Sequence, residues 1–452
     1  MKSNDKKSVL IISCAALLAL AVWFVYWCVS ARYALLPMLY ASLSAALFGL
    51  CLLRLIPSAL SFEEPPAPEA SLRNSRRDRR HPWAAIAFRV ILLHIALYII
   101  AYLFDLIRNG YSGGVLDTLR RLWLRTDSPS YLGIAKNWYV TEGDARFHIV
   151  FFPLYPILIK IFSLFTGGFF GSAMLVTTLC AIGSAIAAYE LFALDNDRST
   201  ALFATTLLCL FPGSIFLLAP MTESLFLLTS LLCIYMCRKK RYLLSGLFGC
   251  LAALSRSVGI LLMLPVFMEA AYDYFGGAAL NRKAVVSRLA GCFTIALGTA
   301  LYLVINKAVT GSFFTFMRYQ REHWSQGLGP FFGTAAYQLQ YFLSSLHTGE
   351  AALGLTLFLP NLLCCLAGLV ILALSAGKLR PSYAAYGLLY YAVTSGCTWL
   401  LSGPRYLAVC FPLAAGLCAL VKGRLERRLL ALVSLVMMLM YMWAYVLGYS
   451  VY

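Results

Sequence analysis

Two carboxylates and two arginines are the residues of this sequence whose types and setting could do chemistry. Asp127 and Glu223 are the acids, Arg256 and Arg405 are the cations, and each lies beside a largely apolar run. Ionisable side chains at membrane depth or at its edge are costly, so they are candidates for function. A carboxylate can take a proton from a hydroxyl group, and the guanidinium fork of arginine binds phosphate through two parallel N–H donors.

Each of these residues also has a purely structural interpretation. Asp127 could be the N-cap of a short helix that begins near the Ser-Pro pair at 128–129. Glu223 could be an acid placed at a helix start by the helix dipole, or else an acceptor contact or the partner of an active-site arginine. Arg256 and Arg405 could be snorkelling arginines at helix ends, or a clamp that stabilises the charge of a phosphate leaving group. The residue types alone leave these alternatives open.

Further candidates lie in or near two long segments, 108–171 and 307–350, since long loops in compact proteins are usually functional. Side chains that could contact a substrate are Tyr131, Arg318, Gln320 and Trp324. The same segments concentrate cations, among them Arg120, Arg121, Arg125, Arg321 and His323. These cations favour an anionic partner, although contact with lipid headgroups is the simpler explanation for any one of them.

The elements that must position these residues are helices in a membrane. Of the 452 residues, 61% are apolar and 12% are charged, whereas a soluble domain has roughly 25% charged residues. Runs of about 20 apolar residues recur, which is the length that crosses a bilayer as a helix. The formal charge of +18 is typical of the positive-inside bias and does not indicate nucleic acid. The fourteen cysteines are all expected within spans, so we predict neither a disulfide framework nor a metal site.

We predict an all-α polytopic membrane protein with about thirteen spanning helices. The predicted spans are 8–30, 34–56, 84–107, 172–194, 199–218, 222–237, 242–257, 258–274, 285–306, 351–376, 382–401, 404–421 and 428–448. They give an N-terminal transmembrane hairpin at 1–60, a basic cytoplasmic linker at 61–83 and a main transmembrane domain at 84–452 with outer loops 108–171 and 307–350.

The distribution of basic residues sets the orientation. With the N-terminus in the cytoplasm, the inner loops hold most of the Lys and Arg, as the positive-inside rule expects. This assignment requires residues 150–166 to lie at the outer surface as an interfacial helix, because a crossing there would put Arg238 to Arg241 outside. Asp127, Glu223, Arg256 and Arg405 then all lie on the non-cytoplasmic side.

Five ordered motifs resemble the GPI mannosyltransferase PIG-V family and its bacterial relatives, within the GT-C superfamily of glycosyltransferases. They are Arg125-Thr-Asp127-Ser-Pro-Ser-Tyr131 with Phe151-Phe-Pro-Leu-Tyr-Pro156; Phe211-Pro212 with Thr222-Glu223-Ser224; Ser255-Arg256-Ser257; Gly311 with Phe316, Gln320 and Trp324; and Ser402-Gly-Pro404-Arg405-Tyr406 with Phe411-Pro412. Thr126 stands where the family has Trp, and Met221 where it has Tyr. These departures, and the additional hairpin at 8–56, leave the identity of the sugar open.

The resemblance implies a GT-C fold and a specific reaction. One hexose, most often mannose, would move from a polyprenyl-phosphate donor to a hydroxyl group of a glycolipid or cell-envelope acceptor, with inversion at the anomeric carbon. Asp127 would be the general base, and Arg256 with Arg405 would hold the donor phosphate. No metal or other cofactor is expected, because arginine alone can stabilise a monophosphate leaving group. The membrane would be the plasma membrane in a bacterium and the endoplasmic reticulum in a eukaryote.

A transporter or flippase of lipid-linked sugars is the alternative. The number of spans and the Pro- and Gly-interrupted helices support it, whereas the lack of an internal repeat and of paired acids at mid-membrane opposes it. The position of the charged residues distinguishes the two. An enzyme gathers acids and cations in an outer pocket, and a transporter gathers them at the bilayer centre.

Overall fold

A computed structural model describes residues 3–61, 82–110, 113–276 and 281–452. Within these ranges the chain is helical, and the only strand-like pairing is an isolated bridge between Leu328 and Cys397. The predicted all-helical membrane architecture is confirmed at this level, since eight described helices are long and apolar enough to cross a membrane. Nearly all of the predicted linker at 61–83 lies outside the described residues.

The eight long helices agree with eight of the predicted spans. They are α1 (Ser3–Ser30), α2 (Leu35–Leu60), α4 (Trp83–Asn109), α8 (Phe169–Phe192), η3 with α12 (Ser257–Leu262, Met263–Phe275), α13 (Arg282–Thr310), α16 to α17 (Ala351–Ser375) and α21 (Arg424–Val446). Each carries an apolar run of the length that a bilayer core of roughly 30 Å requires.

The prediction of about thirteen spans is not confirmed, because the remaining helices are short or broken. They are α9 (Arg198–Leu210), η2 (Pro212–Leu217), α10 (Glu223–Arg238), α11 (Tyr242–Ser255), α18 (Pro381–Thr394), α19 (Gly403–Ala408) and α20 (Phe411–Leu420). The breaks follow from local sequence. Pro212, Pro404 and Pro412 each stand at the start of a helix, where proline fits best because its missing N–H is not needed there.

The N-terminal hairpin packs on the main bundle through both α1 and α2. Near its far turn, Trp23, Phe24 and Trp27 contact Phe332 at the start of α15 (Phe331–His347). On α2, the Arg54 guanidinium donates to the carbonyl of Ala373 on α17 at 2.8 Å. The hairpin is therefore joined to the rest of the molecule by aromatic and polar contacts as well as by the chain.

The helices around the first predicted outer loop are short. They are α5 (Val115–Trp123), α6 (Ser128–Asn137), η1 (Asp144–Val150) and α7 (Leu154–Thr166). Between η1 and α7 the chain bends by 110°. With 13 residues, α7 rises about 20 Å, which is shorter than the bilayer core. In the second loop α14 (Thr315–Trp324) precedes α15.

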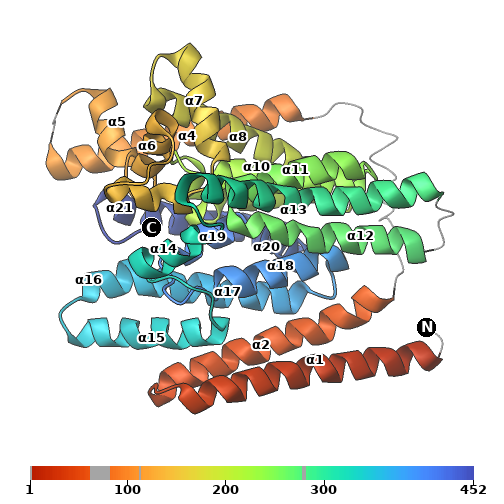
Figure 1. The fold of residues 1–452 in the computed structure, drawn as a ribbon. Helices are drawn as coiled ribbons and strands as arrows, with labels where there is room; N and C mark the ends of the chain where they lie inside the picture. The colour runs from red at the N-terminus through yellow and green to blue at the C-terminus, as the bar shows by residue number, and fades with distance from the viewer. Residues whose placement is uncertain (1–2, 62–81, 111–112, 277–280) are drawn as a thin grey trace.

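The bundle has two chemically different ends (Figure 1). At one end, which we call the basic end, α1 and α13 begin and α10 and α12 finish, and partly buried ion pairs join Arg238 to Asp195 at 2.7 Å and Arg288 to Asp273 at 2.8 Å. At the opposite end, which we call the site end, lie α5, α6, α14 and α19. The four candidate acids and arginines all belong to the site end.

Candidate active site

Asp127 begins α6 but does not cap it with its side chain. The backbone carbonyl of Asp127 accepts from the N–H groups of Ser130 and Tyr131, while its carboxylate makes no capping hydrogen bond. Thr126 before it has φ 54°, a left-handed conformation that is uncommon outside glycine. The capping interpretation therefore holds for the backbone only, and the carboxylate is free to turn toward another partner.

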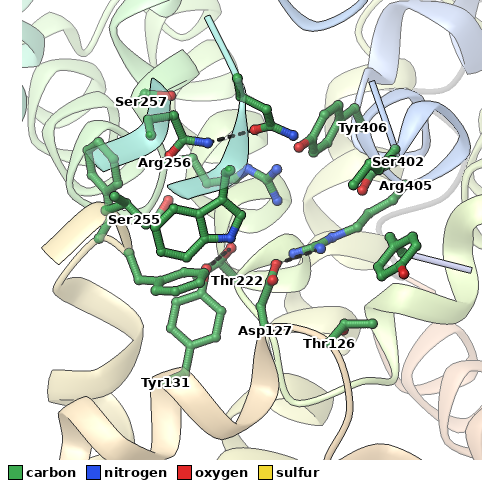
Figure 2. Close-up of a pocket in the computed structure, with 18 residues that line it drawn as sticks. Thr126, Asp127, Tyr131, Thr222, Ser255, Arg256, Ser257, Ser402, Arg405 and Tyr406 are labelled. Carbon is green, nitrogen blue, oxygen red and sulfur yellow. Dashed lines mark hydrogen bonds and ion pairs between the residues drawn. The ribbon is translucent and has the colours of Figure 1, made fainter. Parts of the chain in front are cut away.

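That partner is Arg405. Its Nη1 lies 2.7 Å from the Asp127 carboxylate, whose side chain is 30% exposed. Figure 2 shows the two side chains pointing toward one another from opposite walls of a cavity. Arg405 itself is 5% exposed, and α19 brings it there because Ser402-Gly403-Pro404 starts this short helix at the cavity wall.

Glu223 joins the two arginines. It is fully buried at the start of α10, and its Oε1 accepts hydrogen bonds from both Arg256 and Arg405. The result is a continuous chain of alternating charge, Arg256–Glu223–Arg405–Asp127. Buried charges are tolerated when they are paired and hydrogen-bonded, and here two cations face two anions. The other carboxylate oxygen of Glu223, Oε2, is buried without a hydrogen-bond partner among the described residues.

A cavity of about 350 Å³ is lined by three members of this chain, Asp127, Arg256 and Arg405, whereas Glu223 is fully buried and does not line it. It is lined by Thr126, Asp127, Tyr131, Val150, Phe151, Phe152, Thr222, Ser255, Arg256, Ser257, Gln320, Trp324, Gln326, Leu401, Ser402, Arg405, Tyr406 and Tyr452. Neutral hydroxyl and amide groups and aromatic rings surround the charged residues. Such a lining can hydrogen-bond a polyhydroxylated ligand and pack against its apolar face.

A second cavity of about 410 Å³ adjoins the first and shares Arg256, Gln320 and Tyr406 with it. Its own walls are mainly apolar and include Val258, Phe316, Met317, Leu328 and Val393. Arg321 also lines it, on α14. Arg256 is therefore the one cation common to the polar cavity and its apolar neighbour.

The predicted substrate contacts divide. Tyr131, Gln320 and Trp324 line the first cavity. Glu223, also predicted as a substrate contact, lines neither cavity and instead bridges the two arginines. Arg318 lines neither cavity either, and its guanidinium lies 5.3 Å from the centre of the Tyr319 ring. The reason is helical geometry, because residues two apart on α14 point to different faces.

Several lining residues were not predicted. Gln326 accepts from Gln320 at 2.6 Å and donates to the carbonyl of Trp399 at 3.0 Å. It thereby joins the end of α14 to the loop before α19. Tyr406 and Ser402 lie within a recognised motif, so the motif could have indicated them, but no sequence signal marks Gln326.

The pKa values of Tyr131 and His148, near the cavity, are shifted. Burial, and then the negative charges of Asp127 and Glu223, raise the pKa of Tyr131 above its usual value. The phenol therefore stays protonated and can donate a hydrogen bond. Burial, with His323 as a second cause, lowers the pKa of His148, so this imidazole is neutral at pH 7.

The cysteine prediction needs one correction. All fourteen cysteines are free thiols, but two lie outside the helices: Cys410 between α19 and α20, and Cys397 in the loop after α18, where it lines the second cavity. The predicted span 382–401 was too long, because α18 ends at Thr394. Within the described residues, no three His, Cys, Asp or Glu side chains gather as a possible metal site.

The five motif segments thus contribute side chains to one cavity, although they lie far apart in the sequence. No protein-family model matches the chain, and no curated protein matches it.

Proposed function

We propose that this protein is an integral membrane glycosyltransferase of the GT-C type. It moves a hexose, with mannose as the first candidate, from a polyprenyl-phosphate donor to a hydroxyl group of a glycolipid or cell-envelope acceptor on the non-cytoplasmic side. The observation that carries this proposal is the Arg256–Glu223–Arg405–Asp127 chain, of which Arg256, Arg405 and Asp127 line a polar cavity with an apolar cavity beside it.

The two cavities match the two halves of such a donor. A polyprenyl phosphate needs an apolar surface for its chain and hydrogen-bond donors for its phosphate, while the hexose needs neutral polar partners. The second cavity supplies the apolar surface for the chain, and the first cavity supplies neutral polar partners for the hexose. Arg256, at the boundary of the two cavities, supplies hydrogen-bond donors for the phosphate.

The reaction is a single displacement. The acceptor oxygen attacks the anomeric carbon while the bond from that carbon to the phosphate oxygen breaks. Asp127 takes the proton of the acceptor hydroxyl, and the polyprenyl phosphate leaves with the electron pair. Fixed cations that stabilise this developing charge lower the barrier.

The two arginines have different roles in this proposal. Arg405 is almost fully buried and holds two carboxylates, so it orients Asp127. Arg256 is 15% exposed and borders both cavities, so it contacts the phosphate. Arg321 in the second cavity supplies the other cation. This assignment modifies the sequence-based hypothesis, in which Arg256 and Arg405 were the phosphate clamp.

The distribution of charge favours an enzyme over a transporter. Asp127, Arg256 and Arg405 line a cavity together with residues of the short helices α6, α14 and α19, which lie away from the basic end (Figure 1).

The test uses purified protein in lipid nanodiscs. It is incubated with radiolabelled polyprenyl-phosphate hexoses and crude membrane lipids, and the labelled product is identified by mass spectrometry. Transfer of label to a lipid or envelope acceptor supports the proposal. Donor that remains intact with every hexose, in the presence of folded protein, contradicts it.

A further inference from the structure

The short helix α19, which carries Arg405, is fixed on several sides by polar contacts that the proposed function does not use. It has six residues and follows a non-helical stretch, 395–402, at the cavity wall. Leu400 and Ser402 in this stretch are 2% and 4% exposed, and buried backbone N–H and C=O groups need hydrogen-bond partners. The position of Arg405 therefore depends on what satisfies this stretch.

Two buried amide side chains satisfy it. On α17, Asn361 Oδ1 accepts from the N–H of Gly403 at 2.8 Å, and its Nδ2 donates to the carbonyl of Leu400 at 3.2 Å. On α15, the Gln338 amide donates to the same carbonyl at 2.6 Å. Asn361 and Gln338 are 1% and 2% exposed, so water does not compete for these bonds.

The opposite side of α19 is fixed by close packing. A Cβ atom on Gly213 in η2 would lie 2.0 Å from the carbonyl oxygen of Pro404 and 2.7 Å from the backbone nitrogen of Arg405. The Tyr390 hydroxyl donates to the carbonyl of Tyr406 at 3.0 Å. The backbone on both sides of Arg405 is thus held by neighbouring elements.

We propose that Asn361 and Gln338 are positioning residues. They hold the backbone at 400–403 in the position from which the Arg405 side chain binds both Asp127 and Glu223. Neither amide lines the first cavity, so both act through Arg405. The consequence for catalysis rests on the proposed function, but the consequence for the backbone does not.

The first test measures the backbone directly. Asn361→Leu keeps a similar volume and removes both hydrogen bonds to the stretch 400–403. Tyr40→Phe is the matched control, because Tyr40 donates at 2.9 Å to the carbonyl of Leu362, the next residue on α17. We expect faster hydrogen exchange in peptides covering 396–406 for Asn361→Leu and for Gln338→Met, and no change there for Tyr40→Phe. Unchanged exchange in both amide variants overturns the proposal.

The second test separates positioning from general stability. With Arg405 misplaced, kcat falls while KM for the donor changes little, because the affected groups act mainly in the transition state. A fall of roughly tenfold to hundredfold is expected, as for a displacement of about 1 Å. Tyr40→Phe keeps the wild-type kcat. An equal fall in kcat in the amide variants and in Tyr40→Phe indicates a structural role only and contradicts the proposal.

A conservative variant supplies the rescue. Asn361→Asp keeps the acceptor for Gly403 and, while the buried carboxyl is protonated, also a donor for Leu400. Burial favours the neutral form, so activity as a fraction of the wild-type activity at the same pH should be higher at acidic pH and fall as the pH rises, unlike that of Asn361→Leu. A variant that is equally impaired at every pH counts against the hydrogen-bond explanation. If wild-type protein transfers no hexose, the proposed function fails, while the exchange test still decides the positioning.

Discussion

Asp127 and Glu223 are both carboxylates paired with Arg405, yet their surroundings assign them different tasks. Asp127 is partly exposed in the cavity, with one arginine beside it. Glu223 is enclosed and bridges two arginines. A base must reach its substrate, whereas a buried bridging acid can only hold its neighbours. The difference in exposure therefore favours Asp127 over Glu223 as the proposed base.

Replacing Asp127 by Asn should abolish transfer without unfolding the protein. The amide keeps the shape of the side chain but cannot take a proton, so the rate should fall by about 10² to 10⁴. Arg405 keeps its bond to Glu223, so donor binding should persist. Transfer is measured with labelled donor, and binding with a non-transferable analogue.

The control is Asp117→Asn, since Asp117 lies in the same outer segment with a side chain that is 73% exposed. It should retain wild-type transfer. Full activity in Asp127→Asn would remove this residue as the base.

Replacing Glu223 by Gln should act on stability first. The change leaves Arg256 and Arg405 without their shared anion, and removing one partner of a buried ion pair costs about 3–5 kcal/mol. The free energy of unfolding in mixed micelles measures this loss. Glu350→Gln, an exposed acid on the loop before α16, should change that free energy by less than about 0.5 kcal/mol. Similar values for the two variants would mean that Glu223 does not bridge the arginines.

At the level of elements, the backbone of η2 is packed directly against the start of α19. Gly213→Ala places a methyl group against the Pro404 carbonyl and the Arg405 backbone nitrogen, so one of the two elements must move. Overpacking of this kind costs about 1–3 kcal/mol, and transfer should fall with it, because Arg405 moves relative to Asp127. Transfer rate and free energy of unfolding are both measured.

Gly171→Ala on α8 is the matched control, because a Cβ there meets nothing within 4 Å. Alanine in a helix is favoured over glycine by roughly 0.5–1 kcal/mol, so this variant should be at least as stable as wild type. Wild-type transfer in Gly213→Ala would show that α19 tolerates displacement.

The sequence predicted some elements much better than others, for a physical reason. Long apolar runs such as α4 and α13 have one explanation, since a helix satisfies its own backbone hydrogen bonds in lipid. Segments interrupted by proline or glycine have more than one possible structure. At 199–218, Pro212 divides the predicted span into α9 and η2, and the 16 residues of α10 are below the usual spanning length. Hydropathy averages over such breaks and cannot place them.

The candidate site was predictable as a list of residues but not as a network. Each charged residue stood out against apolar neighbours, and the motifs gave their order. The bond from Glu223 to both arginines depends on the approach of α10, α11 and α19, which no spacing encodes. The second cavity was missed for the same reason, because the bridge between Leu328 and Cys397 joins two distant loops.

At the scale of the whole molecule, the separation of the two ends determines which reactions are possible. The arginine-rich ends of the helices gather at the basic end, and the cavity opens at the site end. Positive segments remain in the cytoplasm during insertion, so the cavity should face the other side. A polyprenyl-phosphate donor would then arrive laterally from the outer leaflet and meet Arg256 and Arg321 before Asp127.

Cysteine labelling tests this orientation without any assumption about activity. Glu142→Cys lies at the site end and Lys378→Cys in the loop between α17 and α18 at the basic end, and both positions are exposed. In intact spheroplasts, an impermeant maleimide should label Glu142→Cys above the wild-type background and leave Lys378→Cys unlabelled until the membrane is opened. Native Cys397 lines the second cavity, and burial raises its pKa to about 11, so it should react slowly and from the same side as Glu142→Cys. The reverse pattern would put the cavity in the cytoplasm, where a donor in the outer leaflet cannot reach it, and would rule out the proposed reaction whatever the chemistry of Asp127.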